Sequence, residues 1–297
     1  MYHNPVLLKE SIDGLNIKPN GIYVDVTFGG GGHSKEIIKK LTTGKLFAFD
    51  QDEDACENAI DNENFTFINQ NFKYINNYLK FYRVEKIDGL IADLGVSSYQ
   101  FDTPERGFST RFNSTLDMRM DKSLIKTAES IVNEYTFEQL AFVFRNYGEI
   151  NNAGKIANDI ILYRKNNKIS NTDDLKKALE RNTNKNNENK FFAQIFQALR
   201  IEVNEELDAL KELLLSTEKT INKGGRIVFI SYHSLEDRLV KNYMKSGNFE
   251  CKLEKDFYGN ILTPFNQIHK KVIIPSDEEI EINSRARSAK LRIAEKN

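Results

Sequence analysis

Three acidic side chains, Asp25, Asp50 and Asp93, each close an apolar run that is typical of a buried strand. Parallel strands bring their carboxyl ends to one edge of a sheet, so we expect the three carboxylates to border one crevice. The first run leads into four glycines, Gly29 to Gly32, which let the backbone turn sharply and let a ligand approach without meeting a Cβ. A carboxylate in the position of Asp50 can accept hydrogen bonds from both hydroxyls of a ribose. These features predict a cofactor that contains adenosine.

The turn itself indicates which cofactor. The dinucleotide fingerprint G-x-G-x-x-G would place its third glycine at Ser34, and a P-loop would need a lysine that Gly32-His33-Ser34 lacks. No basic residue lies in the turn to meet a pyrophosphate, and Asp25 would repel one. A carboxylate there suits a cation, such as the sulfonium and amino group of S-adenosylmethionine (SAM). An ordinary strand-turn-helix, with glycine chosen for packing, is the alternative.

The elements that must hold these residues alternate between strands and helices. Such alternation predicts a doubly wound, parallel α/β sheet. Phe72, just after the third strand, is expected to pack on the adenine or in the core. The stretch 101–112 has no period and is expected to be a long loop near the site. The expected strands are 22–26, 46–50, 65–70, 87–93, 223–234, 271–275 and one in the tail 284–294, and the expected helices are 6–12, 35–41, 53–60 and 235–244.

A helical block interrupts this alternation. Helical periodicity runs from about residue 124 to 215 and contains the polar loop 182–189. We therefore expect a discontinuous SAM-binding domain, 1–122 with 206–297, and an inserted helical domain, 123–205. The separate helices expected in the block are 136–144, 156–162, 172–179 and 192–215.

Composition limits the possible partners and location. The 297 residues carry a net charge of −1, which excludes a globally basic nucleic-acid binder. Locally, however, ten Lys/Arg face five Asp/Glu in 151–200, and five face one in 283–297, as a polyanionic partner would favour. Two distant cysteines and four scattered histidines predict a reduced, cytoplasmic protein without a metal site. We expect no membrane span and no signal peptide, because no apolar run is long enough and the N-terminus lacks the pattern.

Several long motifs occur together in one order. With them the chain resembles the RsmH (MraW) family of bacterial 16S rRNA cytosine-N4 methyltransferases nearly from end to end. The motifs are His3-x-Pro5-Val6-Leu7-Leu8, the turn 29–34, Asp93-Leu94-Gly95-Val96-Ser97-Ser98, Leu116-Asp117-Met118-Arg119-Met120-Asp121, Phe196-Gln197-Ala198-Leu199-Arg200-Ile201, Ser231-Tyr232-His233-Ser234-Leu235-Glu236-Asp237-Arg238 and Arg285-Ala286-Arg287-Ser288-Ala289-Lys290-Leu291-Arg292.

The resemblance implies a class I SAM-dependent methyltransferase, with a Rossmann-like doubly wound sheet and an inserted all-helical domain for RNA recognition. It implies methyl transfer to the exocyclic N4 of a cytosine in the decoding centre, cytosine 1402 of 16S rRNA, within the small subunit. Two positions depart from the family pattern: Tyr99 replaces a proline, and Phe191 to Ile195 replace a His-Pro-Ala-Thr segment. With Asp25 and Gly29, which the turn itself singles out, the predicted cofactor-binding residues are Gly31, Gly32, His33, Asp50, Phe72, Asp93 and Gln100.

A cytosine amine is a poor nucleophile, so the chemistry demands alignment and an oxygen acceptor. We assign that role to Asp93 as a hypothesis, with His33 and His233 as the other candidates. Three other functions stay open: a Rossmann oxidoreductase, a methyltransferase for another substrate, and a non-catalytic ribosome-assembly factor. The protein is expected to be a monomer or a homodimer. The arginines predicted to contact RNA phosphates are Arg106, Arg111, Arg119, Arg285 and Arg287.

Overall fold

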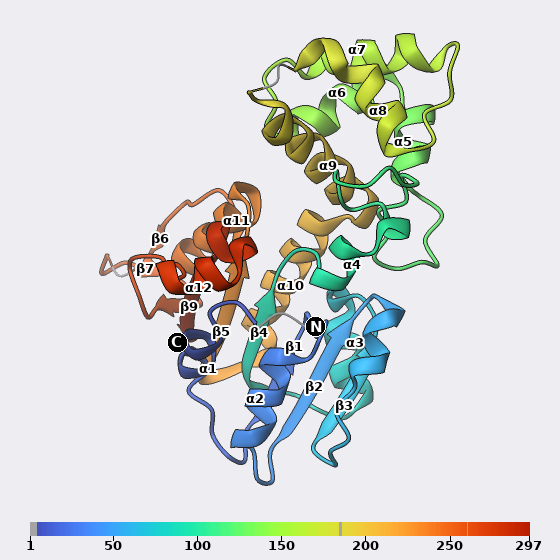
Figure 1. Ribbon diagram of the computed structural model, residues 1–297. Coiled ribbons are helices and arrows are strands. Elements are labelled where there is room, and N and C mark those ends of the chain that lie inside the picture. Colours follow the sequence, from blue (N-terminus) through green and yellow to red (C-terminus); the bar gives the residue numbers. More distant parts are fainter. Residues whose placement is uncertain (1–4, 184–185, 260) are drawn as a thin grey trace. The chain divides into compact units, whose positions relative to one another are not determined.

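The structure is a computed structural model that describes residues 5–183, 186–259 and 261–297 (Figure 1). His3 of the first motif and two positions of the polar loop, 184 and 185, lie outside the described residues. The chain forms two compact units: residues 1–95 with 207–297, which we call the sheet unit, and residues 96–206, which we call the helical unit. Within the described ranges, none of the helices combines the length and the apolar content needed to cross a membrane.

A seven-stranded sheet organises the sheet unit, in the order β3-β2-β1-β4-β5-β9-β8. The first five strands in this order are parallel, and β9 and β8 are antiparallel additions. The strands are β1 (Ile22–Asp25), β2 (Lys45–Asp50), β3 (Phe65–Asn69), β4 (Ile87–Asp93), β5 (Ile221–Ser231), β8 (Phe265–Gln267) and β9 (Lys290–Lys296).

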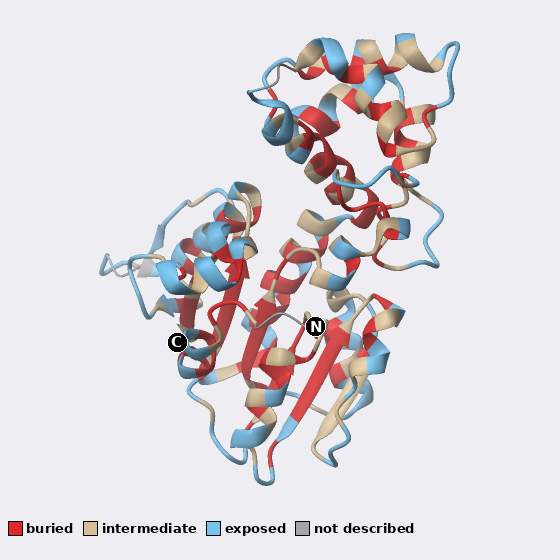
Figure 2. Ribbon diagram, viewed as in Figure 1, coloured by how far each residue is buried: buried red, intermediate tan, exposed pale blue. Residues whose placement is uncertain are grey.

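Helices cover both faces of this sheet, which confirms the predicted doubly wound α/β fold. On one face α1 (Leu8–Leu15) and α2 (Gly32–Lys40) pack on Tyr23, Leu46 and Ile91. On the other face α3 (Ile75–Phe81), α10 (Glu206–Thr220) and α11 (Ser234–Ser246) pack on Val24 and Phe47. Tyr23 and Val24 are consecutive, because side chains of a strand alternate between its faces. Figure 2 shows the strands as the buried centre of the unit.

Parts of the sheet unit differ from the sequence expectation. The parallel arrangement ends at β5, since β9 and β8 can join antiparallel without a crossover helix. The strand expected at 271–275 is a single bridge between Ile273 and Leu291, and the tail begins with a 3-10 turn, Ser284–Ser288, before β9. The helix expected at 53–60 is a 3-10 helix, Glu53–Asn58. The remaining elements are the 3-10 turn Phe72–Tyr74, the hairpin strands β6 (Glu254–Lys255) and β7 (Ile261–Leu262), and α12 (Asp277–Ile282).

The helical unit is built on one apolar cluster. Side-chain caps fix where two of its helices begin: Thr127 starts α5 and Thr136 starts α6, each in a capping box. The expected helix 192–215 is two helices, because Glu205 takes a left-handed conformation between α9 and α10. The helices are α4 (Ser98–Asp102), α5 (Ala128–Glu134), α6 (Phe137–Asn146), α7 (Ala153–Arg164), α8 (Thr172–Leu179) and α9 (Glu188–Asn204), with 3-10 turns at Pro104–Arg106 and Glu180–Asn182.

The two units divide at 95/96, whereas the sequence places the boundary at 122/123. The stretch between these two points is not an isolated loop: it contains α4, and four of its side chains join the buried cluster of the helical unit. These side chains are Phe108, Leu116, Met118 and Met120. Apolar residues without a period gave no sign of this packing, which depends on contacts with distant helices such as α9.

Candidate functional site

The end of the sheet where β1, β2 and β4 finish bears Asp25, Asp50 and Asp93. We call it the carboxyl edge. The strands are parallel neighbours in the order β2-β1-β4, so their last residues lie at the same edge. The negative charge of Asp25 raises the pKa of both Asp50 and Asp93, beyond the larger effect of burial. Asp25, on the middle strand of the three, therefore lies within electrostatic reach of both Asp50 and Asp93.

Asp25 is buried and is held by its own βα unit. One carboxylate oxygen accepts from Ser34 Oγ at 2.7 Å, and the other accepts from the backbone N–H of Thr27 at 3.0 Å. Burial nevertheless raises the pKa of Asp25 to about 6, against the lowering effect of these bonds. A buried carboxylate without a cation beside it costs free energy, which a cationic ligand would recover.

Asp50 holds the glycine turn in place. Its carboxylate accepts from the N–H of Gly29 at 2.7 Å and from the N–H of Asp52 at 2.9 Å. Burial raises the pKa of Asp50 to about 6, against the lowering effect of both bonds. The Asp50 side chain thus connects the end of β2 to the glycine turn that follows β1.

The glycines are required by geometry at one position above all. Gly31 has φ 73° and is the residue before α2, and a Cβ there would meet the Phe28 ring at 2.9 Å. Glycine alone adopts such a φ without steric cost. The following residue, Gly32, begins α2, where a Cβ would overlap Pro5. A larger residue at either of these two positions would therefore clash with Phe28 or Pro5.

His33 is buried in the first turn of α2. Its Nε2 lies 3.2 Å from the carbonyl oxygen of Val6, and its Nδ1 lies 4.0 Å from Asp93 Oδ2. Burial lowers the pKa of His33 to about 4, so the ring is neutral at neutral pH. Without a charge it does not offset the negative charge of the carboxyl edge.

Asp93 is the most perturbed acid. Burial raises its pKa to about 7, and the charges of Asp25 and Glu236 add to that effect, while the hydrogen bond from Tyr232 opposes it. The Tyr232 hydroxyl donates to Asp93 Oδ1 at 2.8 Å, and the backbone N–H of Asp93 donates to Thr27 Oγ1 at 2.6 Å. A carboxyl with a pKa near neutrality can accept or release a proton under physiological conditions.

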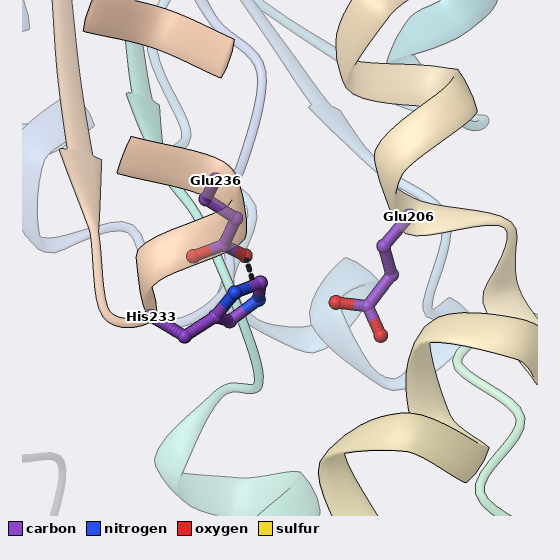
Figure 3. A group of neighbouring side chains, drawn as sticks. All are labelled: Glu206, His233 and Glu236. Atoms are coloured by element: carbon purple, nitrogen blue, oxygen red, sulfur yellow. Dashed lines mark ion pairs between the residues drawn. The ribbon is translucent and has the colours of Figure 1, made fainter. Parts of the chain in front are cut away.

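Tyr232 was not among the predicted site residues. It directly follows β5, which runs parallel to β4 and pairs Ile230 with Asp93, so β5 ends at the carboxyl edge as well. The end of this fourth strand is the sequence signal that could have identified Tyr232. Its N–H donates to Glu236, which also lies 3.0 Å from His233 Nε2 at the start of α11 (Figure 3). Glu206, drawn in the same figure, pairs with Arg200 at 2.9 Å within the helical unit.

The other predicted cofactor residues are placed less directly. Phe72 is half-buried and packs against the apolar cluster that contains Val24 and Phe47. Gln100 belongs to the helical unit, where its side chain forms a capping box with Ser97 at the start of α4. Tyr99, beside it, is 49% exposed. In the other segment that departs from the family pattern, Phe192 and Ile195 are buried in the helical core.

The predicted phosphate-binding arginines fall into two groups. Arg106 is buried and donates to the carbonyls of Arg119 and Met120, and Arg119 forms a two-pronged ion pair with Asp117. These two side chains stabilise the loop that carries them. Arg111 and Arg287, by contrast, are exposed, with Arg111 over the Phe101 ring, and Arg285 is half-buried.

Known proteins give independent information. The model of the MraW methylase family matches residues 1–297. Ribosomal RNA small subunit methyltransferase H of Flavobacterium psychrophilum is 60% identical over 291 residues, covering 98% of this chain and 100% of that protein. The proteins of the same name from Christiangramia forsetii and Cytophaga hutchinsonii are 57% and 56% identical, and cover 99% and 100% of this chain and 98% and 100% of their own lengths.

Proposed function

The chain belongs to the MraW methylase family, and from this premise we propose that it transfers a methyl group from SAM to the exocyclic N4 of a cytosine in 16S rRNA. The target is cytosine 1402 of the decoding centre, and the substrate is the small ribosomal subunit. Relatives aligned over their whole length are named small-subunit rRNA methyltransferases, which supports the RNA substrate. The observation that carries the chemistry is the carboxyl edge, where Asp93 has a pKa of about 7.

The carboxyl edge fits SAM. Asp25 and Asp50 have raised pKa values because they are buried, and the neutral His33 supplies no compensating charge. A ligand with a positive charge and ribose hydroxyls suits both carboxylates, since Asp25 favours the cation and Asp50 accepts hydrogen bonds from the hydroxyls. When bound, the cofactor supplies an activated methyl group on a positively charged sulfur. The turn from Gly29 to Gly32, with His33, would hold its other parts.

Asp93 serves as the proton acceptor. As the bond between the cytosine N4 and the methyl carbon forms, the amine becomes acidic and its proton passes to the Asp93 carboxylate. SAM, held by Asp25, Asp50 and the glycine turn, would supply the methyl group, and its sulfur would keep the electron pair of the broken bond, so charge and atoms balance. A carboxyl with a pKa of about 7 is suited to take up this proton and to release it to solvent afterwards.

Tyr232 is a positioning residue for this step. Its hydroxyl donates to one oxygen of Asp93, which leaves the other oxygen for the substrate amine. The same bond lowers the pKa of Asp93 against the raising effect of burial. Losing it would leave more of Asp93 protonated at neutral pH and would free its side chain to rotate.

Exposed arginines contact the phosphates of the RNA. Arg111 and Arg287 keep this role from the sequence prediction, since both side chains reach solvent, and half-buried Arg285 stays a weaker candidate. Arg106 and Arg119 are bound to backbone carbonyls and to Asp117, and we do not include them in the RNA-binding surface.

The direct experiment is methyl transfer from isotopically labelled SAM to small subunits that lack the modification, followed by nucleoside mass spectrometry. We expect label in N4-methylcytidine at a single position. Label in another nucleoside would overturn the N4 assignment. Transfer to free small molecules or protein without ribosomal subunits would overturn the RNA substrate.

A further inference from the structure

An arm with two exposed aromatic side chains projects from the sheet unit between α11 and β8. Among the residues that the structure describes, its strands β6 and β7 form a two-stranded sheet separate from the seven-stranded one. In the turn that joins them, Phe257 is 97% exposed and Tyr258 is 86% exposed. Figure 2 shows the described part of the arm almost wholly in the colour of exposed residues. These rings therefore contribute almost nothing to a core.

The turn presents the two rings in a defined geometry. Their centroids are 5.7 Å apart, with an angle of 88° between the planes, so the rings touch edge to face. Asp256 fixes the backbone: its carboxylate accepts from the N–H of Tyr258 at 2.8 Å, and its carbonyl accepts from the N–H of Gly259 at 3.0 Å. At 86–97% exposure, ring faces are left open for another planar group.

Positive charge surrounds these rings in the sequence. Four lysines lie in residues 251–271 against Glu254 and Asp256, although the whole chain has a net charge of −1. All four lysines are exposed: Lys252 and Lys255 on the arm, and Lys270 and Lys271 after β8. Lysine ammonium groups on flexible stems suit a polyanionic backbone that passes the arm.

Aromatic rings with lysines distinguish between possible partners. Leu253 and Leu262 of the arm are also exposed, but open ring faces beside lysines are the arrangement by which proteins bind single-stranded nucleic acid. Bases available for stacking occur in single-stranded RNA, because paired bases are already stacked.

We propose that Phe257 and Tyr258 bind unpaired bases of the rRNA substrate by stacking, while Lys252 and Lys255 of the same arm contact its backbone. The inference rests on the proposed function, which makes RNA the substrate. It adds a binding surface on the sheet unit that lies outside the carboxyl edge and takes no part in methyl transfer. The arm would hold a single-stranded part of the substrate, while the target base leaves its own stack to react.

Binding of a single-stranded RNA oligonucleotide of mixed sequence to the full chain tests the proposal. Phe257→Ala and Tyr258→Ala are expected to weaken binding by about fivefold or more each, as measured by fluorescence anisotropy. Ile282→Ala is the matched control, since Ile282 is 75% exposed in the same unit but lies on the acidic helix α12. The melting temperature and SAM affinity should not change in any of the three. Equal RNA binding by all three variants and the unmodified chain would overturn the proposal.

A second substitution separates stacking from apolar contact. Phe257→Leu keeps an apolar side chain but removes the ring, so we expect it to bind RNA as weakly as Phe257→Ala, whereas Phe257→Tyr should bind as the unmodified chain does. Full RNA binding by Phe257→Leu would contradict stacking, because the ring would then not be needed.

Methyl-transfer kinetics with the small subunit as substrate distinguish this proposal from the proposed function. In that assay, Phe257→Ala and Tyr258→Ala should raise KM and leave kcat nearly unchanged, since the two rings are not among the reacting groups. If the unmodified chain shows no methyl transfer, the proposed function fails, but the oligonucleotide result still decides whether the arm binds RNA.

Discussion

The acidic side chains of the carboxyl edge and Asp117 of the helical unit have pKa values shifted in opposite directions. At the carboxyl edge, burial raises the pKa values of Asp25, Asp50 and Asp93, and the side-chain donors there are neutral hydroxyls. In the helical unit, Asp117 is paired with Arg119, and the pKa of Asp117 is lowered by that partner despite partial burial. A carboxylate that an arginine already pairs has its charge compensated within the protein, whereas carboxyls with raised pKa values are candidates for binding a ligand.

The largest effect should come from the acceptor at the carboxyl edge. Asp93→Asn keeps the size of the side chain but cannot take a proton, so we expect single-turnover methyl transfer to fall by about 10²- to 10⁴-fold. SAM affinity, measured by calorimetry, should change far less. Asp61→Asn, at an exposed position of the same unit, is the control and should react normally. Unchanged turnover in Asp93→Asn would remove Asp93 from the chemistry.

In the helical unit the largest effect should be on stability. Phe144 is fully buried in the helical cluster, so Phe144→Ala is expected to reduce the free energy of unfolding by about 3–5 kcal/mol in a urea titration. Phe142, on the same helix, is 55% exposed, and Phe142→Ala should cost less than about 0.5 kcal/mol. Similar losses for the two variants would mean that the cluster does not stabilise this unit as its burial indicates.

A smaller effect is expected from the hydroxyl that supports Asp25. Ser34→Ala removes a buried donor at 2.7 Å and should raise the pKa of Asp25 further. Because more of Asp25 would then be protonated near pH 6.5, SAM affinity should fall by about five- to tenfold, and the loss should shrink at pH 8. A loss that is the same at both pH values would show that Ser34 acts through packing alone.

An effect of similar size is a gain of stability in Asp93→Asn without cofactor. Since the folded-state pKa of Asp93 is raised, the folded chain holds this proton more tightly than the unfolded chain does, and the associated stability is lost as pH rises through about 7. The Asp93 side chain is 24% exposed, which moderates the effect, so we expect Asp93→Asn to be about 1–2 kcal/mol more stable at pH 8 and equal near pH 4. Thermal unfolding at the two pH values provides the measurement.

Local patterns made the sheet and its three acids predictable. Asp25, Asp50 and Asp93 end apolar runs that are typical of buried strands, alternation with helices favours a parallel sheet, and the glycines mark the turn. The antiparallel β9 and the break at Glu205 were not predictable, since neither interrupts the apolar period.

Partners that meet through the fold were not predictable either. The Tyr232–Asp93 bond joins residues 139 positions apart, and the guanidinium of the buried Arg106, predicted to contact RNA, donates to carbonyls 13 and 14 residues away. Residue type and spacing say which side chains can do chemistry, but burial decides which of them are free for a ligand.

Proton release on SAM binding tests most directly whether the carboxyl edge is prepared for a cation. At pH 6, Asp25 and Asp50 are close to their pKa values, and the pH is below the pKa of Asp93, so all three carboxyls hold protons for part of the time. Calorimetry in buffers of different ionisation enthalpy should therefore show release of about one proton or more per SAM bound. S-adenosylhomocysteine, which lacks the sulfonium charge, should release fewer. Binding of SAM without proton release, and with equal affinity from pH 5.5 to 8, would contradict a carboxyl edge that recognises positive charge.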